Sequence, residues 1–268
     1  MIAMEPFLHR EGGSAVIVSM PHSGTFLPDA LRGRLTEDGL AVADTDWHIP
    51  QLYNFLDELD VTVIQANYSR YVIDLNRSVD GSAMYPGQTE TGLCPHSAFS
   101  GESLYLSGAE MVEGEVSQRV ETYWQPYHSK MAAEIKRIKA LYGFAIVWDA
   151  HSIRSSVPRL FSGQLPDLNL GTANGRSCAP ELEARLNRLL VGQDQFSTVC
   201  NGRFTGGAIT RHYGQPASNV HTVQMEITQK SYMYESAGFA FDEGRAAELR
   251  PLLRDMILAL IETGDSHF

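Results

Sequence analysis

Short apolar runs separated by longer amphipathic stretches make up most of the hydrophobic pattern of this chain. Three of these runs, over 15–20, 144–148 and 220–227, are continuous and rich in valine and isoleucine, which is typical of strands buried on both faces of a sheet, and a fourth run predicts a further strand. The predicted strands cover residues 15–20, 61–65, 144–148 and 220–227. The apolar residues of the next segment, ANYSRYVIDLNR, predict a further strand after a turn.

Apolar residues recur at helical spacing between and after these strands. The spacing predicts a helix over residues 49–56 and a longer one over 116–138, in which Pro126 should produce a kink. The segment PELEARLNRLL places Pro180 in the first turn of another helix, and residues 243–263 predict a final amphipathic helix.

Strands that alternate with helices predict an α/β fold, a three-layer α/β/α arrangement with a mostly parallel or mixed central sheet. We find no repeat, low-complexity tract or linker in the 268 residues, so we expect a single domain over 1–268. Open α/β sheets bind ligands at the carboxyl edge of their strands, which makes residues just past the strands functional candidates. The longest predicted loop runs from Ser78 to Ser107, and loops of this length are often functional.

The charge and the cysteine content exclude several classes of protein. A net charge of -11 argues against nucleic acid and membrane surfaces as partners, since both require a basic surface. We expect a cytoplasmic protein, because we find no signal-like start and no run of eighteen apolar residues. The three cysteines are widely spaced and form no CxxC pair, so we expect them to be reduced and structural.

Two histidines follow predicted strands closely. His22 lies two residues past the first strand in VIVSMPHSG, and Asp149 and His151 follow another strand in VWDAHSIRSS. If the extended conformation continues, Asp149 and His151 face the same side, so Asp149 is either a ligand or a hydrogen-bond partner of the histidine. A lone histidine in this position is usually structural, but two at similar strand ends suggest a metal site.

An acidic cluster, VADTDWHIP, precedes the helix predicted from residue 49. A hydrolytic zinc site typically has three nitrogen or carboxylate ligands and one position for water, whose pKa the metal lowers to about 7. His22, His151 and either Asp44 or Asp46 supply that number of ligands. Either aspartate could instead cap the helix. Such ligands suit zinc, cobalt, manganese or iron, of which zinc is our leading candidate.

Glu226 is the only carboxylate in the predicted strand over 220–227. Burying a carboxylate is unfavourable unless it has a partner. Glu226 is therefore interpreted either as a general base that takes a proton from metal-bound water, or as the partner of an arginine in a structural ion pair.

Five arginines lie in or near these motifs: Arg70, Arg77, Arg154, Arg203 and Arg211. Guanidinium groups bind carboxylates in a bidentate manner, so a substrate with two carboxylates would use two or more of these arginines, and one arginine could instead stabilise an oxyanion. The alternative is a surface or ion-pair role, which we favour for Arg70 and Arg203. We find no GxSxG motif or phosphate-binding loop that would favour another chemistry.

Six motifs follow one another in a specific order between Val16 and Tyr232: PHSGTFLP, DTDWH, SRYVIDLNR, DAHSIRSSVPRLF, NGRFTGGAITRHYGQP and VQMEI. With these motifs the chain resembles the N-formylglutamate deformylases, also called N-formylglutamate amidohydrolases. The resemblance implies a metal-dependent hydrolysis of N-formyl-L-glutamate to formate and L-glutamate in histidine degradation. It also implies a fold similar to that of the zinc-dependent exopeptidases.

Carried over residue by residue, the resemblance implies three metal ligands and a base: His22, Asp46, His151 and Glu226. Asp46 is preferred to Asp44 because it is the acid in the family's pattern before this helix. The wider exopeptidase group has a glutamate three residues after the first histidine, where this chain has Thr25. The acidic ligand must therefore come from another part of the chain.

These residues lead to a mechanism in which Glu226 removes the proton from water and Arg154 holds the oxyanion. Arg77 and Arg211 are predicted to bind the substrate's carboxylates, with Asn76 as a hydrogen-bonding neighbour. The formyl group offers little to bind, so specificity should come from the glutamate half. One alternative is a metal-dependent amidohydrolase for another N-acylated acidic amino acid, and a second is a non-catalytic protein that binds acidic metabolites.

Overall fold

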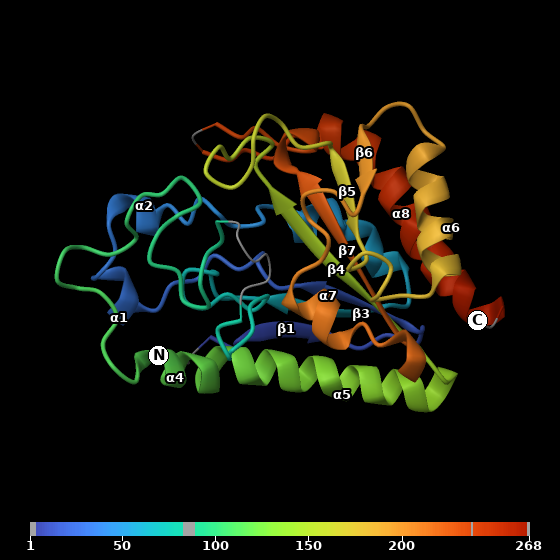
Figure 1. The fold of residues 1–268 in the computed structure, drawn as a ribbon, viewed down its shortest axis with the longest axis horizontal. Helices are drawn as coiled ribbons and strands as arrows, with labels where there is room; N and C mark the ends of the chain where they lie inside the picture. Colours follow the sequence, from blue (N-terminus) through green and yellow to red (C-terminus); the bar gives the residue numbers. More distant parts are fainter. Residues whose placement is uncertain (1–3, 83–88, 237, 267–268) are drawn as a thin grey trace.

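A seven-stranded mixed sheet forms the centre of the computed structural model, which describes residues 4–82, 89–236 and 238–266 (Figure 1). The strands lie in the order β1-β3-β2-β4-β7-β5-β6. Their bounds are β1 Phe7–Arg10, β2 Val16–Met20, β3 Thr62–Ala66, β4 Ala145–Ile153, β5 Leu168–Gly171, β6 Thr198–Cys200 and β7 Val220–Thr228.

The strand directions confirm the predicted mixed, mostly parallel sheet. Four neighbouring pairs are parallel, namely β2 with β3, β2 with β4, β4 with β7, and β5 with β6. β1 pairs with β3, and β5 pairs with β7, in the antiparallel direction. Every residue of β2, β4 and β7 is buried, as expected for the central strands of a sheet covered on both faces.

Eight α-helices are found in the described residues: α1 Asp29–Arg32, α2 Glu37–Leu40, α3 Ile49–Leu52, α4 Glu115–Arg119, α5 Gln125–Tyr142, α6 Pro180–Val191, α7 Ala208–Tyr213 and α8 Glu243–Ser266. Three 3₁₀ turns cover Asn54–Glu58, Pro216–Ser218 and Gln229–Ser231, and a π-helical turn covers Val120–Trp124. Figure 1 shows α5 along one side of the sheet and α6 beside α8 at another.

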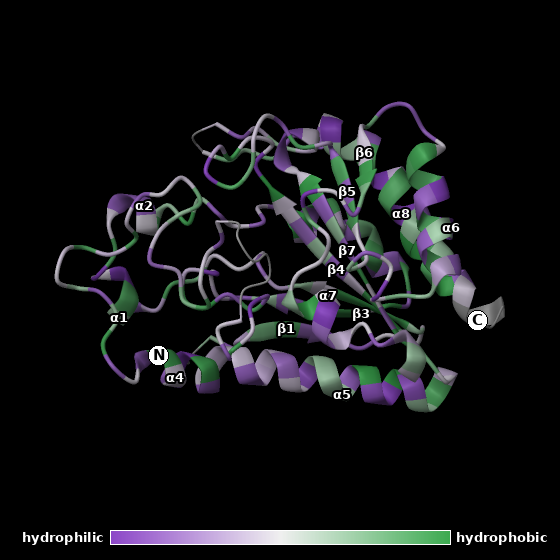
Figure 2. Cartoon of the chain, viewed as in Figure 1, coloured by the Kyte–Doolittle hydropathy of each residue, from purple (hydrophilic) through white to green (hydrophobic). Residues whose placement is uncertain are grey.

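Two neighbouring residues of β4 show that helices cover both faces of the sheet. Trp148 donates a hydrogen bond to Tyr53, which directly follows α3. Asp149 accepts one from Ser19, whose hydroxyl contacts Tyr127 of α5. Consecutive strand residues point to opposite faces, so α3 and α5 lie on opposite sides of the sheet. Figure 2 shows hydrophobic residues along the strands, with hydrophilic bands in β4 and β7 among them, and α5 alternates between hydrophobic and hydrophilic residues.

The prediction of a strand within ANYSRYVIDLNR was wrong, since residues 67–77 contain turns and only a single isolated bridge, between Tyr68 and Phe26. Side chains of this segment bind nearby backbone amides, which competes with strand pairing. Ser69 accepts a hydrogen bond from the amide of Tyr71 at 3.2 Å, and Asp74 accepts one from the amide of Asn76 at 2.9 Å.

The predicted helices are confirmed in place but differ in extent. The helix expected over 49–56 ends after one turn and continues as a 3₁₀ turn. The helix expected over 116–138 is interrupted by the π-helical turn, which ends two residues before Pro126. Proline has no N–H group, so it leaves a carbonyl of the preceding turn without its usual donor. Pro180 begins α6, and α8 covers the predicted final helix.

Several smaller expectations can be compared with the structure. The three cysteines are free thiols, and burial raises the pKa of Cys178 to about 12. The predicted loop over 78–107 contains no helix or strand in its described residues, while 83–88 lie outside them. None of the helices in the described parts of the chain combines the length and the apolar character needed to cross a membrane.

Candidate functional site

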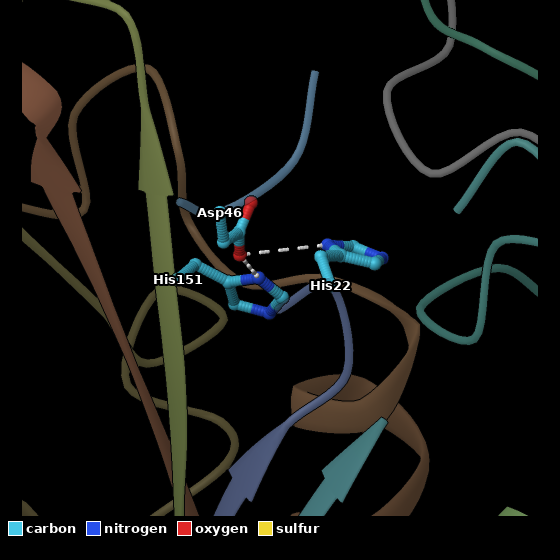
Figure 3. Close-up of side chains that lie close together, drawn as sticks. All are labelled: His22, Asp46 and His151. Atoms are coloured by element: carbon cyan, nitrogen blue, oxygen red, sulfur yellow. Dashed lines mark hydrogen bonds and ion pairs between the residues drawn. The ribbon is translucent and has the colours of Figure 1, made fainter. Parts of the chain in front are cut away.

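The three predicted metal ligands come together at the carboxyl edge of β2 and β4 (Figure 3). His22 follows β2 by two residues, and Asp46 lies in the loop before α3. His151 lies inside β4, because that strand continues five residues past its predicted end. All three side chains are buried, and one ligand atom from each lies within 4.8 Å of the others.

One carboxylate oxygen of Asp46 faces both imidazole rings. It lies 2.9 Å from Nδ1 of His151 and 3.8 Å from Nδ1 of His22. Figure 3 shows the carboxylate directed at both rings, whose centroids are 4.8 Å apart. The amide of Asp46 also donates a hydrogen bond to the carbonyl of His22 at 3.0 Å, which fixes the loop to the end of β2. Two ring nitrogens and a carboxylate oxygen thus converge, as the ligands of a divalent ion would.

The other ring nitrogen of each histidine lies next to a second carboxylate. Nε2 of His22 is 2.7 Å from Asp74, and Nε2 of His151 is 3.1 Å from Asp149. Carboxylates in this position fix the ring and leave the opposite nitrogen for a metal. Because β4 remains extended through residue 153, Asp149 and His151 face the same side, as the sequence indicated.

The charges around the cluster favour a cation. Burial alone would lower the pKa of His151, but Asp149 and Asp46 raise it well above its ordinary value. Burial and the charge of Arg70 lower the pKa of His22, which favours the neutral ring that a metal requires. The position between Asp46 and the rings therefore attracts positive charge, and these residues fit a divalent metal.

Glu226 lies on β7, directly opposite His151 in the register of β4 and β7. Burial raises its pKa to about 8, with Asp46 acting in the same direction and His151 in the opposite one. Its carboxylate accepts a 3.4 Å hydrogen bond from Gln224. Within the described residues it forms no ion pair with an arginine or lysine, which argues against the structural ion pair considered from the sequence.

The two aspartates of the acidic cluster have separate partners, and neither caps α3. The N-cap residue of this helix is His48, which makes no side-chain capping bond. Asp44 accepts a hydrogen bond from the amide of Phe99 at 2.6 Å and another from Arg154 at 3.3 Å. Arg154 is thus held by Asp44, and it is not among the residues that line the cleft beside the cluster.

The two arginines predicted to bind carboxylates differ in position. Arg77 lines the cleft, and its Nε donates to the carbonyl of Thr91 at 2.8 Å. Arg211 belongs to α7, donates to the carbonyl of Gly206 at 2.9 Å, and is not part of the cleft lining.

Asn76 lines the cleft, and its amide group already has protein partners. Its Oδ1 accepts a hydrogen bond from the amide of Ile209 at 2.7 Å. Its Nδ2 lies 2.9 Å from Nε2 of His151 and 3.4 Å from Asp149. Asn76 therefore donates to Asp149, the carboxylate partner of His151, and its amide packs against the ring of His151 while forming part of the cleft wall.

Residues 14–233 match the family model described as N-formylglutamate amidohydrolase. The chain belongs to the N-formylglutamate amidohydrolase family. Two proteins named N-formylglutamate deformylase are similar to it over 97% of each chain, with 46% identity for that of Pseudomonas aeruginosa and 45% for that of Pseudomonas putida. The family resemblance seen in the sequence motifs is thereby confirmed.

Solved structures show that this member of the N-formylglutamate amidohydrolase family shares its fold with other proteins. An N-formylglutamate amidohydrolase from Ralstonia eutropha superimposes with a TM-score of 0.81 at 22% identity, covering 98% of both chains. A gene product of Agrobacterium tumefaciens gives a TM-score of 0.72 at 18% identity and covers 96% of this chain and 95% of that one. At these identities the likeness concerns the fold.

Sequence reasoning missed two residues of this N-formylglutamate amidohydrolase site and placed a third only partly. Asp74 and Gln224 were not singled out, although both are polar residues within apolar segments, which was the available signal. Arg70 was expected at the surface or in an ion pair. It is a buried ion-pair residue, 2.6 Å from Asp74, and it lines the cleft.

Proposed function

We propose that the protein hydrolyses N-formyl-L-glutamate to formate and L-glutamate, using a divalent metal held by His22, Asp46 and His151. The observation that carries this proposal is the convergence of these three side chains beside Glu226 on the neighbouring strand. The names of the two Pseudomonas relatives, at 46% and 45% identity, support the substrate.

The proposed metal is zinc, because two imidazoles and one carboxylate form a usual catalytic zinc ligand set. When bound, such an ion lowers the pKa of water and polarises a carbonyl group. Glu226 accepts the proton of the attacking water and returns it to the leaving nitrogen. Burial raises its pKa to about 8, and this suits both transfers, since a base that is too acidic holds the proton poorly.

The arginines of the cleft bind the charged parts of the substrate in this proposal. Arg77 lines the cleft and takes a carboxylate of the glutamate half. Arg70 lines the cleft and its Nη1 is 3.9 Å from Asp46, whereas Arg154 contacts Asp44 and does not line the cleft. We therefore assign the developing oxyanion to Arg70 in place of Arg154. The role of Arg211 stays a prediction.

Two further parts of the proposal are a cytoplasmic location, which we expected from the sequence pattern, and a place in histidine degradation, which the family resemblance implies. Neither part affects the chemistry of the cleft, and fractionation of the producing cells tests the first. Growth on histidine after deletion of the gene tests the second, since loss of growth is expected if the chain acts in that route.

The deciding experiment measures metal content and formate release on the same sample, purified without an affinity tag or chelator. We expect about one metal per chain, and formate release that stops on chelation and returns with Zn²⁺. Formate release by metal-free protein would reject the metal while leaving the substrate. Turnover of acetyl or succinyl derivatives in place of N-formyl-L-glutamate would reject the substrate. Ligand binding that survives chelation, without turnover of any of these compounds, would indicate a binding protein.

A further inference from the structure

The backbone carbonyls on either side of Asn76 are both held by aromatic ring N–H groups. Nε2 of His128 lies 2.8 Å from the carbonyl of Leu75, and Nε1 of Trp124 donates to the carbonyl of Arg77 at 3.0 Å. A carbonyl oxygen only accepts hydrogen bonds, so Nε2 of His128 must carry its proton. Two donors thus flank Asn76, whose side-chain amide touches the ring of His151.

Trp124 is the last residue of the π-helical turn, and its four-residue spacing from His128 directs both rings to this segment. The turn covers Val120–Trp124 and brings an extra residue into the helix immediately before α5. Trp124 and His128 are four residues apart, so they lie on the same face of the helix. Their rings stack with centroids 3.7 Å apart, and Nδ1 of His128 lies 2.9 Å from the hydroxyl of Tyr213. The stack leaves each ring little freedom to turn away from its carbonyl.

Asn76 has little room to shift. A Cβ atom added to Gly207 would lie 2.3 Å from its Nδ2 atom, so the backbone of Gly207 is in close contact with the amide. The next residue, Arg77, lines the cleft. A small movement of the backbone here would change the support of His151 on one side of Asn76 and the place of Arg77 on the other.

We propose that Trp124 and His128 are positioning residues of the active site. Their ring N–H groups fix the backbone around Asn76, His128 chiefly for the contact of Asn76 with His151, and Trp124 chiefly for the place of Arg77. The kinetic part of this proposal rests on the proposed function, because it takes Arg77 as a substrate-binding residue. The structural part depends only on the two hydrogen bonds.

The kinetic test uses Trp124→Phe, which keeps the stacked ring and removes its donor. Loss of one such hydrogen bond corresponds to about a tenfold effect. W124F should raise KM for N-formyl-L-glutamate about tenfold and leave kcat within about a factor of two. His128→Phe should instead lower kcat about tenfold, and His128→Gln, whose amide can donate to Leu75, should restore most of it.

A matched control is Ser177→Ala, which removes a buried 2.7 Å hydrogen bond to the carbonyl of Thr222, near the start of β7 and outside the cleft lining. Amide hydrogen exchange of residues 74–77 supplies a readout independent of activity. Faster exchange of this segment in W124F than in S177A supports the structural part of the proposal, whether or not the chain is active. If the wild-type chain releases no formate, only the proposed function is rejected. Unchanged exchange of this segment in W124F overturns the proposal, and so does an equal rise of KM in S177A. If H128F does not fold, the measurements on W124F alone test the proposal.

Discussion

His151 and Glu226 occupy directly paired positions on two adjacent parallel strands, β4 and β7. Nine residue pairs, from Ala145 with Val220 to Ile153 with Thr228, hold these strands in register. The separation between a candidate metal ligand and the candidate base is therefore set by a sheet ladder, and strands position side chains more accurately than loops do. His151 and Glu226 lie on different strands, so a substitution at one can test the metal-ligand role or the base role without removing the other side chain.

Glu226→Gln should keep the metal and lose turnover. A glutamine fills the same space but cannot accept a proton, and general bases contribute on the order of a hundredfold or more to the rate. We expect kcat for formate release to fall at least about a hundredfold, with metal content by elemental analysis unchanged. Glu134→Gln, at another buried glutamate on α5, serves as the control. Near-normal turnover in E226Q would remove the base role from Glu226.

Asp74→Asn should weaken metal binding although Asp74 is not itself a proposed ligand. The carboxylate holds Nε2 of His22 at 2.7 Å, and loss of such a partner typically lowers metal affinity by about 10–100-fold. Competition with a chelator for Zn²⁺ measures the change. Asp44→Asn alters a neighbouring buried aspartate that contacts neither histidine and is expected to bind Zn²⁺ nearly as the wild type does. Equal affinities in D74N and the wild type would contradict the prediction.

Arg77→Lys should impair substrate binding more than catalysis. Lysine keeps the charge but cannot form two parallel hydrogen bonds with a carboxylate, so we expect KM for N-formyl-L-glutamate to rise about tenfold. Steady-state kinetics measure the change, and Arg185→Lys on α6 is the control. Arg211→Lys, assayed alongside, decides its open role. A KM change close to that of R77K places Arg211 on the substrate, and one as small as that of R185K does not. An unchanged KM in R77K would reject the assignment of Arg77.

Stability should fall with acid because of His128. Burial lowers its pKa to about 4 from an ordinary value of 6.5, with the charge of His212 acting in the same direction. Between pH 4 and pH 6.5, His128 carries a proton in the unfolded chain but not in the folded chain. The stabilisation is therefore complete above pH 6.5 and is lost on descent to about pH 4, by roughly 3 kcal/mol in total.

Urea unfolding of metal-free protein at a series of pH values tests this linkage, with His128→Gln as the comparison. Every other titrating group is present in both proteins, so the difference between their two stability profiles isolates His128. The difference should change steadily from pH 6.5 to 4 and be constant above. Parallel profiles across this range would show that His128 does not titrate as its burial indicates.

Long apolar segments made the centre of the fold predictable, and short or locally bonded segments did not. β2, β4, β7, α6 and α8 were found because their patterns are continuous or periodic over many residues. β1 and β6 have four and three residues, too few to show a period. The strand predicted after β3 failed because hydrogen bonds from Ser69 and Asp74 to nearby amides favour turns, which hydrophobicity does not reveal.

The candidate site was predictable where a residue's place depended on a strand, and not where it depended on contacts between loops. His22, His151 and Glu226 follow from the strand pattern, and the resemblance selected Asp46 from two aspartates. Asp74 was missed because its partner His22 lies 52 residues away and the two meet only through turns. The contact of Arg154 with Asp44 spans 110 residues and was hidden for the same reason.

The position of β7 in the sheet makes activity dependent on the completion of folding. β7 is the last strand in the chain, but it lies between β4 and β5 and so joins the group β1 to β4 to the pair β5 and β6. All three candidate ligands precede it in the sequence. The strand that joins the two parts of the sheet is thus also the one that carries Glu226, the candidate base, to its place opposite His151.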